Sequence, residues 1–261
     1  MLRLTFGDTE VHVSTTTTLS RLLSATHRRY RDAPETGRFD RRSYRTIHVE
    51  IPPPYSAPEL ALREALSEIA VEIAAHHGWL AIRAVVVERD GRALVLVGAP
   101  GSGKSTLAAH LVSRGWHLLS DDVAFIDEQR SSIVAHQGLM AFRSGAMPHL
   151  PSSFRAALEE SRWFVDEHGE LSFYEVDPAS VFGGDVWSVE AAFDAVIVIE
   201  DGTGARGVEP LSRDDLALFT IDGRPVTLSA APGPSLGVVR KQPAGRMADH
   251  IERWCDVHAG G

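Results

Sequence analysis

The stretch GAPGSGKST, residues Gly98–Thr106, constrains the fold more than any other part of the sequence. It matches the pattern G-x-x-x-x-G-K-[ST] in full. The fixed positions of that pattern are Gly98, Gly103, Lys104 and Ser105. A β-rich run, Ala93–Val97, precedes the stretch and a helical pattern follows it, which is the strand–loop–helix context that this motif requires. The sequence therefore predicts a loop that binds phosphate groups through its backbone N–H groups and the start of a helix.

Each residue type in this loop has a chemical reason. Glycines allow the backbone N–H groups to turn inward around phosphate oxygens, and Lys104 is long enough to reach the β- and γ-phosphates of a nucleotide. The Ser105 hydroxyl is a suitable ligand for Mg²⁺, which keeps several waters and takes few protein oxygens. We expect the nucleotide-binding residues to be Gly98, Ala99, Pro100, Gly101, Ser102, Gly103, Lys104, Ser105 and Thr106.

Two adjacent carboxylates, Asp121 and Asp122, follow the apolar run 116–120. The helix that starts at Lys104 should end near Gly115, since glycine suits the left-handed position after a helix. A strand–helix–strand unit has parallel strands and a right-handed crossover, and ligands bind beyond the carboxyl ends of such strands. The acid pair is therefore predicted to face the phosphates or a metal ion on them. The alternative is an exposed turn that carries two acids.

A second acid pair competes for the metal. The buried-strand candidate Phe193–Ile199 ends in Glu200 and Asp201, which is similar to the metal-side strand of common P-loop ATPases. This pattern keeps another function open, a nucleotide-dependent ATPase switch, and Arg83 keeps open a nucleotide-binding module without catalysis. A GTPase is disfavoured because the sequence has no N-K-x-D guanine signature.

The dipeptide Asp90-Gly91 lies between two β-rich runs and predicts a tight β-hairpin. A two-residue loop places Arg92 opposite Arg89 and, farther along, Arg83 opposite Gly98. An arginine at the mouth of the loop could bind a phosphate or stabilise charge that develops during transfer. The alternative for Arg83 is an ion pair with a surface carboxylate.

The chain of 261 residues is long enough for one large domain or two small ones. Short strands and a helix are predicted within the first fifty residues, and the proline-rich segment Pro52–Pro58 breaks regular structure. We predict a small α+β subdomain over residues 1–55 and a catalytic domain over residues 56–261. The catalytic domain should begin with a helix whose apolar stripe is Leu62, Leu66, Ile69 and Ile73.

Composition and charge exclude several classes of protein. The formal net charge is -9, which argues against sequence-independent binding of DNA or RNA. No apolar stretch approaches the roughly 20 residues of a membrane helix, and the N-terminal residues alternate like a strand rather than a signal peptide. The single cysteine excludes an internal disulfide. We expect a cytoplasmic protein, and the sequence leaves its oligomeric state open.

The run GAPGSGKSTLAAHLVSRGWHLLSDDV resembles the core of the HPr kinase/phosphorylase superfamily. It is most similar to the HPr-kinase-related kinases encoded with peptide-modification clusters, which include lasso-peptide kinases. The family pattern is a phosphate loop, a short helix, an RG turn and then LxxDD or LLSDE. This sequence has the matching residues Arg114-Gly115, Leu118-Leu119, Ser120 and Asp121-Asp122. The preceding hairpin supports the resemblance, because most P-loop proteins reach this strand from a parallel crossover.

The resemblance implies an α/β fold with a P-loop kinase core of the HPr kinase/phosphoenolpyruvate carboxykinase type. It implies transfer of phosphate from ATP, with Mg²⁺, to a serine of a peptide or protein, or alternatively to a small-molecule alcohol. Asp121 would be the base near the attacking hydroxyl, and Asp122 would support it or bind the metal with Ser105. Lys104 would contact the phosphate oxygens.

The sequence also departs from the family. Relatives usually have histidine where this chain has Arg83, and arginine cannot accept a proton as a neutral histidine can. The glycine-rich ERGLGI-type motif of HPr kinases has no counterpart here, which argues against HPr itself as the substrate. Arg143, in the segment RSGAM, lies where relatives place a lysine near the active site and is a candidate for binding phosphate or substrate. The basic segment RKQPAGR could meet an anion or simply face solvent.

Overall fold

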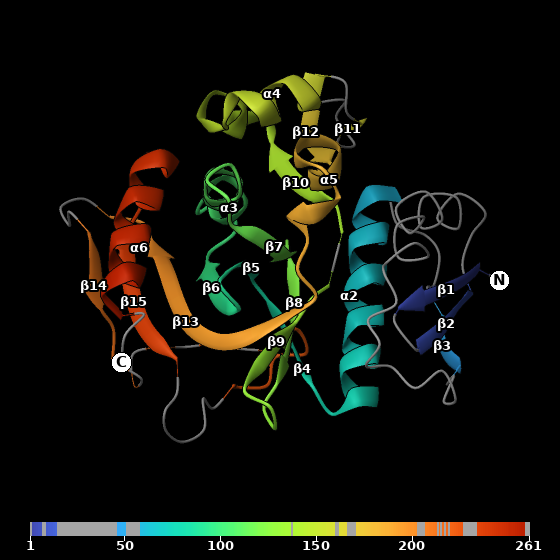
Figure 1. The fold of residues 1–261 in the computed structure, drawn as a ribbon. Coiled ribbons are helices and arrows are strands. Elements are labelled where there is room, and N and C mark those ends of the chain that lie inside the picture. Colours follow the sequence, from blue (N-terminus) through green and yellow to red (C-terminus); the bar gives the residue numbers. More distant parts are fainter. Residues whose placement is uncertain are drawn as a thin grey trace. The chain divides into compact units, whose positions relative to one another are not determined.

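A computed structural model of the chain describes residues 2–6, 9–14, 46–50, 58–136, 138–159, 162–165, 171–202, 207–212, 214, 216, 218, 220–226 and 234–258. The fold is a mixed α/β fold, as the sequence predicts (Figure 1). The chain divides into two compact units. The first comprises residues 1–79 and 164–170, and the second comprises residues 80–163 and 171–261. The subdomain boundary after residue 55 stays a prediction.

The first unit contains the strands expected near the N-terminus. Strand β1 (Leu2–Phe6) pairs antiparallel with β2 (Thr9–Ser14), and β2 pairs parallel with β3 (Thr46–Glu50). Helix α2 (Pro58–His77) is the predicted helix, and its stripe residues Ile69 and Ile73 are buried. The helix predicted between β2 and β3 and the proline-rich segment before Pro58 lie outside the described residues.

The second unit is built on a nine-stranded sheet. Its strands are β4 (Leu80–Arg83), β5 (Val85–Arg89), β6 (Arg92–Gly98), β7 (His117–Ser120), β8 (Val123–Asp127), β9 (Ser132–Val134), β13 (Glu190–Glu200), β14 (Val208–Pro210) and β15 (Ser235–Arg240). A smaller sheet has the order β10 (Met140–Arg143), β12 (Leu171–Val176), β11 (Arg162–Val165). The helices are α3 (Lys104–Val112), η1 (Ser144–His149), α4 (Ser152–Glu159), α5 (Pro178–Phe182), η2 (Gly184–Val186) and α6 (Ala244–His258).

The directions of the strands bring several strand ends to one edge of the sheet. Strand β13 pairs parallel with β6 on one side and with β15 on the other. Strand β5 lies between β6 and β7 and is antiparallel to both, so β6 and β7 run in the same direction. The predicted parallel arrangement around α3 is confirmed, with β5 inserted between the two strands. The carboxyl ends of β6, β7, β13 and β15 therefore lie on the same edge.

The hairpin register is confirmed over its regular part, from Arg89 opposite Arg92 to Val85 opposite Leu96. The prediction that Arg83 lies opposite Gly98 is wrong. Strand β4 pairs with β8, where Arg83 is opposite Val123, and Gly98 pairs with Ile199 of β13. The chain leaves the hairpin at Ala84, whose N–H donates to the Asp122 carbonyl at 3.1 Å and so directs β4 toward β8.

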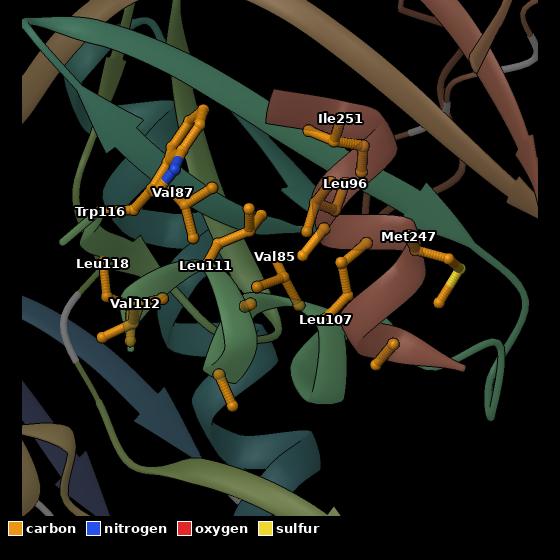
Figure 2. Close-up of a cluster of buried hydrophobic side chains, with 14 of the residues drawn as sticks. Val85, Val87, Leu96, Leu107, Leu111, Val112, Trp116, Leu118, Met247 and Ile251 are labelled. Atoms are coloured by element: carbon orange, nitrogen blue, oxygen red, sulfur yellow. The ribbon is translucent and has the colours of Figure 1, made fainter. Parts of the chain in front are cut away.

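Helices α3 and α6 pack together on the same hydrophobic core as one face of the sheet. Figure 2 shows leucine and valine side chains of α3, β5 and β6 meeting Met247 and Ile251 of α6. The side chains of β6 alternate between two cores: Leu94 and Leu96 join this core, while Ala93, Val95 and Val97 join the other. Full burial of each large apolar side chain stabilises the fold by roughly 1.5–3 kcal/mol. The packing fixes α3, and with it the loop that precedes α3.

The downstream half agrees with the sequence in part. Strand β13 contains the predicted run 193–199, and α6 contains the helix predicted near the C-terminus. Strand β15 was not predicted. The strand expected near 226–230 lies almost entirely outside the described residues. The helix expected over 212–221 is not borne out: residues 212, 214, 216, 218, 220 and 221 are described and none is in an α-helix, and Thr220 forms a bridge with Ile82 instead. Among the described helices, none combines the length and apolarity needed to cross a membrane.

Candidate functional site

The shared carboxyl edge of the sheet collects most of the candidate residues. Each strand that ends there leads directly into polar or glycine-rich chain. These segments are the glycine loop after β6 (residues 98–104), Asp121-Asp122 after β7, Glu200-Asp201 at the end of β13, and Arg240-Lys241 at the end of β15. Because parallel strands bring these ends together, residues far apart in the sequence can act on one ligand.

The glycine loop needs glycine for two different reasons. Gly98, Gly101 and Gly103 have φ values of 151°, 83° and 99°, a region that other residues rarely adopt. At Gly98 a side chain would also collide, since a Cβ atom would lie 2.6 Å from the Ile199 carbonyl oxygen and 2.9 Å from Ser102 Oγ. Gly103 begins α3, and its carbonyl accepts the Leu107 N–H at 2.8 Å. The loop that joins β6 to α3 therefore turns tightly, with Gly98 packed against the backbone of β13.

Lys104 lies half-buried inside the loop. Its Nζ donates to the carbonyl oxygens of Gly98 at 2.8 Å and Ala99 at 3.1 Å. Burial lowers the pKa of Lys104, while the charges of Asp121 and Asp122 act in the opposite direction. The structure therefore brings the predicted lysine and the predicted acid pair into one electrostatic environment.

The two acids of this pair have different surroundings. Asp121 Oδ2 accepts the N–H of Ala141 in β10 at 3.0 Å, which fixes the direction of that carboxylate. Asp122 has a φ of 96° and its Oδ1 lies 3.3 Å from the Arg83 guanidinium. The Asp122 side chain is 44% exposed and Arg83 is 54% exposed, so solvent screens this ion pair and it contributes little to stability. Arg83 is therefore placed against Asp122, as the alternative interpretation from the sequence expected.

The second acid pair faces cations from the neighbouring strand. Glu200 pairs with Arg240 opposite it in β15, and Asp201 Oδ1 lies 3.5 Å from Lys241 Nζ. Lys241 Nζ also donates to the carbonyl of Gly101 in the glycine loop at 3.0 Å. In the part of the chain that the structure describes, no group of three or more histidine, cysteine or acidic side chains is arranged to hold a metal. The basic segment of the sequence thus contacts the loop.

Arg143 also lies beside the loop. It ends β10, it is exposed, and its Nη1 is 3.8 Å from the position that a Cβ of Gly101 would take. Its guanidinium makes no ion pair or hydrogen bond with any other described side chain. An arginine without a carboxylate partner is well suited to bind an anion.

His136 is a neighbour of the acid pair that the sequence did not single out. Its backbone N–H donates to Ser120 Oγ at 3.0 Å, and Ser120 immediately precedes Asp121. Burial lowers the pKa of His136 to about 4, although the charge of Asp122 acts in the opposite direction. His136 carries no local motif, and only the pairing of chain segments far apart in the sequence reveals it. Lys241 belongs to the basic segment RKQPAGR, but the sequence did not show that it contacts the glycine loop.

Comparison with known proteins finds a similarity to HPr kinases. No family model matches the chain. The HPr kinase/phosphorylase of Clostridium acetobutylicum is 26% identical over 160 residues, which are 60% of this chain and 45% of that protein. The chain therefore spans less than half the length of this curated relative. The solved structure of the Hpr(Ser) kinase/phosphatase from Coxiella burnetii is 15% identical, with a TM-score of 0.42, and the match covers 69% of this chain and 99% of that one. The resemblance to HPr kinases predicted from the sequence is confirmed by the curated relative.

Proposed function

We propose that this relative of HPr kinase/phosphorylase is an ATP- and Mg²⁺-dependent kinase with a P-loop core, and that it transfers the γ-phosphate to a serine hydroxyl of a peptide or protein. The observation that carries the proposal is the placement of Lys104 and the pair Asp121-Asp122 at one edge of the sheet, close enough for both acids to influence the lysine. Phosphoryl transfer needs a phosphate cradle, charge neutralisation and one acceptor for the hydroxyl proton. These residues are of the types that supply all three.

The glycine loop fits the phosphates of a nucleotide. Lys104 has only the backbone carbonyls of Gly98 and Ala99 as hydrogen-bond acceptors within 3.1 Å among the described residues, and a phosphate is a stronger acceptor than either. The buried Ser102 hydroxyl has no hydrogen-bond partner among the described atoms. Arg143 adds a second cation beside Gly101. In this proposal, Lys104 binds the β- and γ-phosphates and Arg143 binds the transferred group or an anionic part of the acceptor.

Asp121 is the better candidate for the base. The Ala141 N–H orients its carboxylate through Oδ2. The acceptor oxygen attacks the γ-phosphorus, its proton passes to Asp121, and the bond from phosphorus to the ADP oxygen breaks. Asp122 forms an exposed ion pair with Arg83, and its negative charge lies next to Asp121.

The residues present also fit Mg²⁺, which is usually bound by one or two carboxylates together with substrate phosphates. Ser105 and Asp122 are the residues that would hold it. When bound, the metal neutralises negative charge on the phosphates. The role of Arg83 in this arrangement is to limit the directions in which the Asp122 carboxylate turns.

The ATPase switch suggested by Glu200 and Asp201 has weaker support. Both acids face cations of β15 and the residue after it. Asp122 also faces an arginine, but Asp121 and Asp122 are the acids whose charges act on Lys104 of the glycine loop. The acceptor is either a peptide serine or a small-molecule alcohol, so the test includes both kinds of acceptor.

A phosphate-transfer assay tests the proposal directly. The protein is incubated with ATP, Mg²⁺ and either serine-containing peptides or small alcohols, and the products are analysed by mass spectrometry. We expect one added phosphate on a serine. Phosphate release that needs no acceptor and disappears in Glu200→Gln would instead identify an ATPase switch. Nucleotide binding with neither reaction would identify a non-catalytic module.

A further inference from the structure

Lys241 connects the end of the sheet to the tip of the glycine loop. Its backbone N–H donates to the Glu200 carbonyl at 2.8 Å, which continues the β13–β15 pairing by one residue. Its Nζ donates to the Gly101 carbonyl at 3.0 Å and lies 3.5 Å from Asp201 Oδ1. One side chain therefore contacts the loop and the last residue of the acid pair at the same time.

The Gly101 peptide is a point where the loop needs such support. Residues 99–101 are exposed, and Gly101 has a φ of 83°, where glycine moves more freely than other residues. Within the described loop, the adjacent Ser102 N–H is held by the Ala99 carbonyl at 3.0 Å. A carbonyl that turned toward bound phosphates would repel them, because both carry negative charge. A cation on the Gly101 carbonyl prevents that rotation.

Arg143 and Lys241 lie beside the same glycine but differ in their partners. The Arg143 guanidinium is exposed beside Gly101 and has no side-chain partner among the described residues. The Lys241 ammonium is already engaged by the Gly101 carbonyl and Asp201. This difference separates a residue suited to bind an anion from one suited to hold the protein in place.

We propose that Lys241 is a positioning residue that holds the glycine loop, through the Gly101 carbonyl, in the conformation that binds nucleotide phosphates. The inference rests on the proposed nucleotide-binding function. Asp201 holds the Lys241 ammonium near the loop, and the adjacent pair of Glu200 and Arg240 fixes the backbone from which Lys241 extends. In this proposal the second acid pair stabilises the position of Lys241, and through it the glycine loop, and does not bind a metal.

The variant Lys241→Met keeps the length of the side chain and removes its donor. We expect the dissociation constants of ADP and of ATP with Mg²⁺ to rise about three- to tenfold, which is the range for one partly exposed charged hydrogen bond. The KM for ATP should rise similarly, with kcat at saturating ATP nearly unchanged. Lys241→Arg keeps a cationic donor and should recover most of the affinity. The control Arg253→Ala removes an exposed cation from α6 and should bind nucleotide as the wild type does.

Two further measurements separate this role from others. The double variant Lys241→Met/Asp201→Asn removes both charges; if it binds nucleotide like the wild type, Lys241 merely neutralises Asp201 and the proposal is wrong. Hydrogen exchange of the glycine loop, measured without nucleotide, should be faster in Lys241→Met than in wild type and in Arg253→Ala. Unchanged exchange would overturn the positioning role. A wild-type protein that binds no nucleotide would refute the proposed function, and the exchange experiment would still decide what Lys241 does to the loop.

Discussion

Two pairs of acids end two strands of the same sheet, and their surroundings differ. Asp121 and Asp122 follow β7, where they meet a backbone N–H of β10, the exposed Arg83 and the lysine of the glycine loop. Glu200 and Asp201 lie at the end of β13, which runs in the same direction, but there Arg240 at the end of β15 and Lys241 after it supply one cation for each. In sequence both pairs are an apolar run followed by two carboxylates.

The comparison shows that the neighbouring strand decides what such a pair can do. Glu200 and Asp201 each face a cation, whereas in the first pair Asp122 faces Arg83 and Asp121 is oriented by a backbone N–H, so Asp121 is the residue that distinguishes the first pair. The Ala141 N–H orients the Asp121 carboxylate through Oδ2, and an ionised carboxylate has two oxygens that can accept a proton. The predictions below change one pair or its surroundings at a time.

The largest effect is expected for Asp121→Asn. The amide keeps the shape of the side chain but cannot accept the hydroxyl proton, so the transfer rate should fall by about 10²–10⁴-fold. The affinity for ATP with Mg²⁺ should change by less than about threefold, since Asp121 is not assigned to the phosphates or the metal. Steady-state kinetics and calorimetry on the same preparation measure the two quantities. Transfer at the wild-type rate would remove Asp121 from the role of base and, with it, the functional contrast between the pairs.

The next effect is a dependence of stability on pH that comes from His136, the buried histidine near Asp122. The pKa of His136 is lowered by burial to about 4 from 6.5. Between these values the unfolded chain binds a proton and the folded protein does not. The free energy of unfolding should therefore fall by roughly 3 kcal/mol as the pH drops from 6.5 to 4, with no contribution from this group above pH 6.5.

Denaturant unfolding at several pH values measures this slope. In His136→Gln the part of the slope due to this group should disappear. The control His149→Gln removes an exposed histidine from η1 and should keep the wild-type slope. An unchanged slope in His136→Gln would show that the ring near Asp122 is not held neutral by the fold.

The part of the site that could be predicted is the part that local motifs and patterns of neighbouring residues determine. The glycine loop, α3 and the position of Asp121 and Asp122 follow from a motif and from helical and apolar patterns. The hairpin register was right as far as Val85, where local pairing determines it. It failed at Arg83 because the Ala84 N–H bonds to the Asp122 carbonyl, a contact that sequence pattern does not encode.

Strand β15 shows why the surroundings of the second acid pair could not be predicted. Its centre is Gly237, and glycine lowers the strand propensity of a short apolar run. The structure needs that glycine, since a Cβ there would lie 2.5 Å from Val208 Cγ1 and 2.9 Å from Ile197 Cδ1. Without this strand, the segment RKQPAGR has no assigned position. With it, Arg240 falls opposite Glu200, and Lys241, the next residue, lies with its Nζ 3.5 Å from Asp201 Oδ1.

A smaller effect is expected for Arg83→Gln, which removes the cation beside Asp122. The ion pair is exposed, so the stability of the fold should change by less than about 1 kcal/mol. If Asp122 is a metal ligand, loss of Arg83 frees its carboxylate to turn, and the Mg²⁺ concentration for half-maximal activity should change by about two- to fivefold. A titration of activity with Mg²⁺ measures this change. A loss of activity as large as that of Asp121→Asn would instead mean that Arg83 acts on the transferred phosphate.

The smallest effect is expected for Glu200→Gln. The side chain keeps hydrogen-bonding atoms toward Arg240 and loses its charge, and the partly exposed ion pair that it replaces is worth at most about 1 kcal/mol. Transfer to the acceptor and the affinity for ATP with Mg²⁺ should both stay within about twofold of the wild type. The reason is that this carboxylate is assigned neither to proton transfer nor to binding of the metal or the phosphates. The same kinetic and calorimetric measurements as for Asp121→Asn allow a direct comparison of the two strand ends. A drop of a hundredfold or more would make Glu200 a catalytic or metal-binding group, and the acid pair after β13 would then be the chemical site.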